Sequence, residues 1–394
     1  MTLEFELDGA PVSVSDEEAS LLDVLRDECD VTSVKDGCSP QGQCGCCTVL
    51  VDGTPRVACV TPVSRVRGRA VTTVDGLDDV DDWAEAFCAT GASQCGFCTP
   101  GIIVRLAALS PDVRTDRPAV DKALLAHLCR CTGWQTIREA CSLMSRGRTD
   151  VEAPSGASPA RSAERVALAE RRAALEGGVP QTVGPAVALG RGGFATDQAP
   201  AGALLAVRDD GGEWIVGRSM GELRRRSGVT QGRRTTAPPT WPVEPPPGSW
   251  AVTLQTTWVE PAYLEPDAAW CAPGGEPSSP LGNGGAFGGK VASEVGSVAR
   301  RLADEHGQPV RVLMSREATV RLGPKRPPLG LGLDASGAGV VRLARPGDAA
   351  DEEVLRRCIL AVAPQVDIEY VDVAGPPVGA SLRAAGWALS LIHI

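Results

Sequence analysis

Cysteine dominates the residues of this sequence that could do chemistry. The chain has 14 cysteines, and twelve of them precede residue 142. Thiolates ligate soft metal ions and iron–sulfur clusters in reducing compartments, and cysteines form disulfides in oxidising ones. The first residues show no basic segment followed by a long apolar run, so no signal peptide is evident. We therefore expect a cytoplasmic protein whose cysteines bind metal.

The spacing of these cysteines groups them into two sets. The first set reads C-x5-C-x-C-C over residues 38–47, and its first interval is one residue longer than in the plant-type iron–sulfur spacing C-x4-C-x2-C. The second set joins Cys95-x-x-Cys98, which fits zinc as well as iron, to Cys129-x-Cys131, which is an unusual zinc spacing. Spacing alone favours iron–sulfur ligation and leaves zinc, structural disulfides and spare buried thiols open.

The elements that must position the first set are mostly strands. Residues 3–7 alternate apolar and polar side chains, and Asp8-Gly9 and Asp52-Gly53 are typical hairpin turns. One helix is indicated near residues 21–25. Residues 1–76 therefore predict a small, β-rich, ferredoxin-like domain.

The chain changes character after residue 76. Apolar residues recur at helical spacing over 77–150, which predicts about four short helices with the second cysteine set at helix ends. Residues 151–180 have the Pro, Gly and Ser content of a linker. The chain from 181 onward is rich in Gly, Pro and Trp, with a strand pattern at 251–259 and a helix-then-strand pattern at 293–313. We expect an α+β multidomain protein.

Composition disfavours several classes of protein. Of the 394 residues, 22% are charged and 43% are hydrophobic, which is typical of a folded chain rather than a disordered one. The net charge of −10 disfavours binding to the phosphate backbone of nucleic acids. No apolar run approaches the ~20 residues that a membrane-spanning helix needs.

The cysteine motifs resemble those of a known family. Residues 37–49 (G-C-S-P-Q-G-Q-C-G-C-C-T-V) are similar to the first cluster motif of the molybdenum hydroxylases, which include xanthine dehydrogenases and aldehyde oxidoreductases. Residues 94–101 (Q-C-G-F-C-T-P-G) and 129–133 (C-R-C-T-G) resemble the second cluster motif. Both motifs occur in the family's order, and the resemblance spans residues 1–145.

This resemblance implies a β-grasp ferredoxin-like domain at 1–76 and a four-helix domain at 77–150, each with one [2Fe–2S] cluster. The ligands that it implies for the first cluster are Cys38, Cys44, Cys47 and Cys59. Those that it implies for the second are Cys95, Cys98, Cys129 and Cys131. Cys46 stands where a small residue is typical of the family, and it is the alternative to Cys47. We expect the other cysteines to be buried small apolar side chains: Cys29, Cys88, Cys141, Cys271 and Cys358.

The second half resembles the molybdenum-binding subunit of the same family less completely. Residues 190–197 (G-R-G-G-F-A-T-D) are similar to its opening, and 259–266 (V-E-P-A-Y-L-E-P) to its E-x-x-Y-L-E-P segment. Residues 284–290 (G-G-A-F-G-G-K) resemble its Gly-rich loop, in which glycines let backbone N–H groups approach a phosphate. The resemblance implies an incomplete α/β molybdenum-binding domain over 181–388. The molybdopterin contacts that it implies are Gly285, Ala286, Phe287, Gly288 and Gly289.

Three departures limit this second resemblance. Only residues 267–283 separate the Y-L-E-P segment from the Gly-rich loop, so the family's Gln-bearing stretch has no counterpart here. Val291 replaces the acidic residue of purine-oxidising members, which predicts that xanthine is not a substrate. The family's glutamate base and its flavin domain also have no counterpart, so we assign no catalytic residue.

The function that the resemblance implies is oxidation. Such an enzyme hydroxylates an aldehyde or an N-heterocycle with water and sends electrons from molybdopterin through two clusters to an external acceptor, such as a separate flavin subunit. The alternative is an electron-transfer iron–sulfur subunit that serves a separate catalytic subunit.

The last residues suggest a different origin from the rest. Residues 389–394 (L-S-L-I-H-I) back-translate to the transposase end that is used to fragment DNA for sequencing. We therefore expect residues 389–394 to be a non-native tail, the chain to be cut short, and this chain to be inactive alone.

Overall fold

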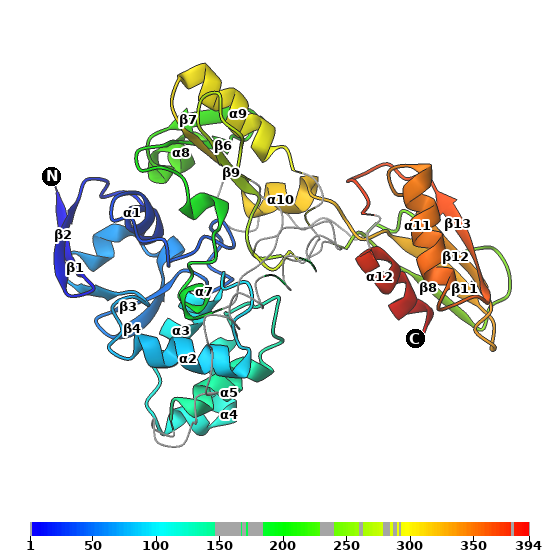
Figure 1. Ribbon diagram of the computed structural model, residues 1–394, viewed down its shortest axis with the longest axis horizontal. Helices are drawn as coiled ribbons and strands as arrows, with labels where there is room; N and C mark the ends of the chain where they lie inside the picture. Colours follow the sequence, from blue (N-terminus) through cyan, green and yellow to red (C-terminus); the bar gives the residue numbers. More distant parts are fainter. Residues whose placement is uncertain are drawn as a thin grey trace. The chain divides into compact units, whose positions relative to one another are not determined.

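The protein divides into two compact units of mixed α/β structure (Figure 1). The computed structural model describes residues 2–145, 167, 171, 184–228, 240–259, 263–278, 284–286, 290, 293–379 and 382–393. Unit 1 contains Met1–Arg234, Tyr263–Phe287 and Glu294–Arg316. Unit 2 contains Thr235–Ala262, Gly288–Ser293 and Glu317–Ile394. Apart from residues 167 and 171, the linker expected at 151–180 lies outside the described residues.

Unit 1 begins with a five-stranded sheet of order β2-β1-β5-β3-β4. Its strands are β1 (Leu3–Leu7), β2 (Ala10–Val14), β3 (Thr48–Val51), β4 (Thr54–Val57) and β5 (Ala70–Thr72). β1 and β5 are parallel, and the other pairs are antiparallel. Both predicted hairpins are confirmed, because Asp8-Gly9 and Asp52-Gly53 have positive φ at both central positions, as a type I′ turn requires.

Short helices complete this part of unit 1. They are α1 (Leu21–Asp27), η1 (Ala58–Val60) and η2 (Val63–Val66). The Ser20 side chain caps α1 by accepting a hydrogen bond from the backbone N–H of Asp23. The apolar face of α1 is almost fully buried, so this helix packs in the core of the sheet domain.

Helices follow the sheet in the chain. They are α2 (Val80–Thr90), α3 (Thr99–Ala107), η3 (Val113–Thr115), α4 (Arg117–Leu124) and α5 (Gln135–Leu143). α2 ends at Gly91, whose φ of 69° is the left-handed conformation that favours glycine. Trp83 and Phe87 of α2 are fully buried, with ring centroids 6.2 Å apart. Cys95 and Cys98 lie just before α3, and Cys129 and Cys131 lie between α4 and α5.

The remainder of unit 1 contains a second sheet, of order β7-β6-β10-β9, in which β6 and β10 are parallel. Its elements are α7 (Pro185–Ala188), η4 (Ala195–Asp197), β6 (Leu204–Arg208), β7 (Trp214–Gly217), α8 (Met220–Arg226), β9 (Ala268–Cys271), α9 (Val295–His306) and β10 (Val310–Leu313). Ala188, Leu189 and Phe194 belong to the same buried apolar cluster as the first 145 residues. The segment after the expected linker therefore shares a core with both cysteine-bearing parts.

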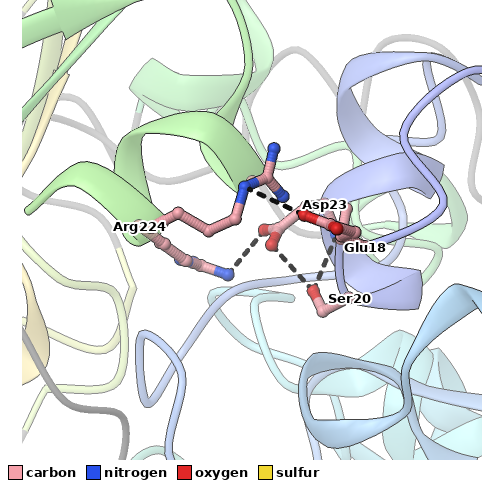
Figure 2. A pocket seen from close by; sticks show the side chains of 7 residues that line it. Glu18, Ser20, Asp23 and Arg224 are labelled. Atoms are coloured by element: carbon pink, nitrogen blue, oxygen red, sulfur yellow. Dashed lines mark hydrogen bonds and ion pairs between the residues drawn. The ribbon is translucent and has the colours of Figure 1, made fainter.

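Ion pairs join α8 to the sheet domain. Arg224 of α8 lies 2.5 Å from Asp23 of α1 and 2.7 Å from Asp36. Figure 2 shows Arg224 reaching toward Asp23, which is also hydrogen-bonded to Ser20, in a small polar pocket. Arg311 of β10 pairs with Asp27 at 2.8 Å. These side chains are at most 14% exposed, so solvent screens the pairs weakly.

A buried lysine makes a further connection. The side chain of Lys35 is 1% exposed, forms an ion pair with Asp197, and donates hydrogen bonds to the carbonyls of Thr32 (2.6 Å) and Gly190 (2.7 Å). Arg26 also pairs with Asp197, at 2.7 Å. Burial alone would raise the pKa of Asp197, but the two facing cations hold it below its usual value.

Unit 2 has one four-stranded sheet, of order β13-β12-β11-β8. Its elements are β8 (Val252–Gln255), α10 (Arg316–Leu322), β11 (Leu329–Leu333), β12 (Gly339–Ala344), α11 (Ala349–Leu360), β13 (Val366–Val371) and α12 (Leu382–Ile392). β12 and β13 are parallel, and α11 and α12 contribute Ile359, Ala388 and Ile392 to the apolar core. The expected tail at 389–394 is thus helical through Ile392, which is 6% exposed.

We predict that Asp197→Asn destabilises unit 1 by about 3–5 kcal/mol, because it leaves two buried cations without their carboxylate. Urea unfolding at neutral pH measures this loss. The difference from wild type should shrink as the pH falls through the lowered pKa of Asp197, because protonation removes the same charge.

The matched control for this prediction is Glu305→Gln. Glu305 pairs with Arg301 at 2.9 Å on the surface of α9, with both side chains about half exposed. Its loss should leave the unfolding midpoint almost unchanged, because exposed pairs contribute little. Equal losses for the two variants would contradict a structural role for the buried pair.

Candidate functional site

The first cysteine set lies on a buried loop and a short helix. Cys38, Cys44, Cys46 and Cys47 precede β3, and Cys59 lies in η1; each is at most 6% exposed. Ser39, Gly42 and Gly45 have positive φ, so the chain curls repeatedly between the cysteines. Strand β3 and helix η1 thereby bring Cys47 and Cys59 together, and the Cys59 N–H donates to the Cys47 sulfur at 3.4 Å.

The thiols of the first set contact one another. The Cys38 thiol is hydrogen-bonded to those of Cys44 and Cys59. The Cys59 thiol is also hydrogen-bonded to that of Cys47. Hydrogen bonds from Cys44 and Cys59 hold the pKa of Cys38 below its usual value, which favours a thiolate at this position. The same hydrogen bonds raise the pKa of Cys44 and Cys59, so Cys38 is the member of this set at which the metal-binding thiolate form is favoured.

The second set joins two loops of the helical part. Cys95 and Cys98 are buried, whereas Cys129 and Cys131 are half-buried. The Cys131 and Cys95 sulfurs lie 3.5 Å apart, and Cys129 is hydrogen-bonded to Cys131 and Cys98. Those two hydrogen bonds lower the pKa of Cys129 to about 2. The structure thus brings all four predicted residues of this set together.

Cys46 lies between the two sets. Its thiol is hydrogen-bonded to Cys44. The hydrogen bond to Cys129 and burial raise the pKa of Cys98, and Cys46 adds a smaller contribution. A Cβ atom built on Gly37 would lie 3.0 Å from the Cys44 sulfur and 3.1 Å from the Cys46 sulfur. Cys46 therefore contacts Cys44 of the first set, whereas Cys47 contacts Cys59.

The loops of the two sets touch through their main chains. A Cβ atom built on Gly101 would lie 2.2 Å from the carbonyl oxygen of Gly45, so only glycine permits this approach. The Leu128 N–H donates to the Cys44 carbonyl at 2.9 Å. His127 Nε2 lies 3.0 Å from Thr48 Oγ1, and burial together with the Arg105 charge lowers the pKa of His127 to about 4. Sequence reasoning missed His127, because one histidine beside a cysteine motif carries no periodic signal.

The predicted Gly-rich loop reaches the second set. Gly285 has a φ of 80°, and a Cβ atom built on it would lie 3.0 Å from the Arg130 Cβ and 3.7 Å from the Cys131 sulfur. The neighbouring Gly284 carbonyl accepts a hydrogen bond from the Leu264 N–H at 2.9 Å. Gly285 and Ala286 are described, whereas the predicted contacts at 287–289 and the substituted position 291 lie outside the described residues.

The five cysteines outside the two sets and Cys46 were expected to be buried, and for one of them this prediction is wrong. Cys141 and Cys271 are buried, and Cys29 and Cys358 are half-buried. Cys88 is exposed, because the buried face of α2 runs through Trp83, Ala84 and Phe87 and leaves position 88 toward solvent. All 14 cysteines are free thiols.

Two absences concern the described residues only. No three of their His, Cys, Asp or Glu side chains are arranged to hold a single metal ion. None of their helices is both long enough and apolar enough to cross a bilayer.

Comparison with known proteins supports the iron–sulfur interpretation. The [2Fe-2S] binding domain family matches residues 73–142. The nicotinate dehydrogenase small FeS subunit of Eubacterium barkeri is 36% identical over 147 residues, which are 36% of this chain and 92% of that protein. The xanthine dehydrogenase iron-sulfur-binding subunit of Escherichia coli O157:H7 is 35% identical over 144 residues, which are 35% of this chain and 89% of that protein.

The fold also has a counterpart among solved structures. The aldehyde oxidoreductase of Desulfovibrio gigas superposes with a TM-score of 0.63 at 18% identity, over 97% of this chain and 58% of that one. At this identity the likeness concerns the fold alone, and the chain spans only 58% of the length of that structure. The sequence identity to these relatives and the match to the domain family show the family. This chain belongs to the xanthine dehydrogenase and aldehyde oxidoreductase family, and it contains the family's iron–sulfur unit.

Proposed function

We propose that the protein is an oxidoreductase of the molybdenum hydroxylase type, which passes electrons from a molybdopterin site through two [2Fe–2S] clusters to an external acceptor. The observation that carries this proposal is the convergence of eight thiols in two sets of four, next to the Gly-rich loop. A [2Fe–2S] cluster supplies one-electron transfer when bound. The chain's own residues bind it, orient it and exclude water from it.

The ligands of the first cluster are Cys38, Cys44, Cys47 and Cys59. Contacts run from Cys44 through Cys38 and Cys59 to Cys47, whereas Cys46 contacts the series at Cys44, at one end of it. The Gln41 N–H donates to the Cys38 sulfur at 3.0 Å, which stabilises negative charge on the thiolate. The ligands of the second cluster are Cys95, Cys98, Cys129 and Cys131.

The molybdopterin contacts are the loop at 285–289. Gly285 would place a Cβ atom 3.0 Å from Arg130 Cβ and 3.7 Å from the Cys131 sulfur, so this glycine lies against a ligand of the second cluster. This contact supports an order in which the second cluster is nearer the molybdopterin and the first is nearer the acceptor. The substrate is an aldehyde or an N-heterocycle, and the acceptor is a separate flavin subunit or another electron carrier.

A proposed domain organisation accompanies this function. A β-grasp ferredoxin-like domain at 1–76 and a four-helix domain at 77–150 each hold one cluster, and 181–388 form part of the molybdenum-binding domain. Free thiols throughout the chain fit the reducing cytoplasm, where we place the protein.

The direct test of cluster binding is metal analysis with electron paramagnetic resonance. We expect about four irons and four sulfides per chain and two distinct signals in the reduced protein. Cys95→Ser and Cys131→Ser should each remove one signal and retain the other, because each set binds its cluster separately.

Cysteines outside the predicted sets provide the controls for this test. Cys88→Ser, at an exposed position, should keep both signals. Cys46→Ser should also keep both, whereas Cys47→Ser should remove the signal of the first cluster. Zinc in place of iron, or loss of both signals from a single substitution in one set, would refute the proposal.

The contact between the Gly-rich loop and the second cluster gives a separate prediction. Gly285→Ala places a Cβ atom against Arg130 in a left-handed conformation that costs an L-residue about 1–2 kcal/mol. We expect the signal of the second cluster to shift and that of the first to stay unchanged. The matched control is Gly274→Ala, which has a similar φ of 68° but no atom within 4 Å of its added methyl group. Equal effects of the two substitutions would argue against the contact.

A further inference from the structure

Two hydrogen bonds join the loop that carries Cys44 to the loop that carries Cys129. The Leu128 N–H donates to the Cys44 carbonyl at 2.9 Å, and His127 Nε2 lies 3.0 Å from Thr48 Oγ1. His127 and Thr48 are each 4% exposed, so water does not compete for the bond between their side chains. The junction thus links the first cysteine set to the residues that directly precede Cys129.

The donor in the bond between the side chains follows from the partners of Thr48. Its hydroxyl has one proton and donates it to the Gly45 carbonyl at 2.8 Å. The Thr48 oxygen must then accept from His127, so Nε2 carries a proton. Nδ1 is buried and has no hydrogen-bond partner among the described residues, and a proton there would be an unpaired buried donor. His127 is therefore in the neutral Nε2–H tautomer.

His127 is held at both its main chain and its ring. The Trp134 indole N–H donates to the His127 carbonyl at 3.1 Å. The ring packs against the turn at Gly45, since a Cβ atom built on that glycine would lie 2.5 Å from the ring Cδ2. The imidazole consequently fixes the Gly45 turn relative to the second loop, and the Cys44 carbonyl directly precedes this turn.

We propose that His127 is a positioning residue that holds the Leu128–Cys44 hydrogen bond in place, and that this bond is the route by which electrons cross between the two cysteine sets. The inference rests on the proposed function. From the Cys129 sulfur, the bonded path follows the main chain to the Leu128 N–H, crosses one hydrogen bond, and continues through Cys44 to its sulfur. With a cluster bound at each set, one electron would leave the group held by Cys129, which is oxidised, and reach the group held by Cys44, which is reduced. No proton moves, because the Leu128 and Nε2 hydrogens stay on their nitrogens.

The test substitution is His127→Leu, which removes the Nε2–H and keeps an apolar side chain of moderate size. We expect electron exchange between the two centres, measured after flash reduction of the purified protein, to slow measurably as the open junction becomes populated. Losing one buried hydrogen bond lowers the ratio of closed to open junction roughly tenfold. Hydrogen-exchange protection of the Leu128 amide should fall by a similar factor. Iron content and both resonance signals should remain at wild-type levels.

Three further variants separate positioning from general destabilisation. His127→Gln offers an amide N–H near the place of Nε2 and should restore the exchange rate. Thr48→Val removes the acceptor and should slow exchange as His127→Leu does. Thr61→Val makes the same chemical change two residues after Cys59, where the hydroxyl donates to the Val57 carbonyl at 2.9 Å, and should leave the rate unchanged.

Each outcome decides the inference. An unchanged electron-exchange rate in His127→Leu, or no restoration of the rate by His127→Gln, overturns the inference. The proposed function still stands in that case if the wild-type protein shows both resonance signals. If His127→Leu loses one of the two resonance signals, the electron-exchange rate of Thr48→Val tests the inference instead, and an unchanged rate there overturns it. A wild-type protein without the two signals would instead refute the proposed function, and the inference would fall with it.

Discussion

The arrangement of unit 1 depends on one steric constraint, the contact between the main chains of the two cysteine loops. Gly101 in the first turn of α3 packs against the Gly45 carbonyl, at a distance that excludes any Cβ atom. Gly45 in turn leaves room for the His127 ring. Because both loops can approach so closely, the Leu128 N–H reaches the Cys44 carbonyl, and the two thiol sets become neighbours. A side chain at either glycine would separate the strand-rich part from the helical part at the position where the two cysteine loops meet.

Buried charge connects this pair of loops to the rest of unit 1. Lys35 is eleven residues before Cys46, and its backbone N–H donates to the Cys46 carbonyl at 3.3 Å. The ammonium group of the same residue pairs with Asp197 and contacts the Gly190 carbonyl. Lys35 therefore connects the first cysteine loop to the segment that follows the linker. Phe194 of that segment packs edge-on against Phe97, with ring centroids 5.1 Å apart. Phe97 lies between Cys95 and Cys98 in the chain. One segment thus contacts both cysteine loops.

Local patterns were sufficient to predict much of unit 1 from the sequence. The hairpins at Asp8-Gly9 and Asp52-Gly53, the helix near residue 21 and the grouping of the thiols all follow from short-range spacing and turn chemistry. The division of the second half was not predictable, because 235–262 joins 317–394 in unit 2 across a long intervening stretch that belongs mainly to unit 1. His127 was missed for a related reason. Its role depends on Thr48, a residue 79 positions away, and no sequence period reports that pairing.

The unusual first interval of the cysteine motif has a geometric explanation. One extra residue between Cys38 and Cys44 would push the two sulfurs apart if the loop ran extended. Ser39 and Gly42 both adopt positive φ, at 43° and 68°, so the chain turns back on itself twice within the interval. The same curl directs the Gln41 N–H at the Cys38 sulfur, and the two thiols remain hydrogen-bonded to each other. The added residue is therefore absorbed by backbone conformation, and Cys38 and Cys44 stay in contact despite the longer interval.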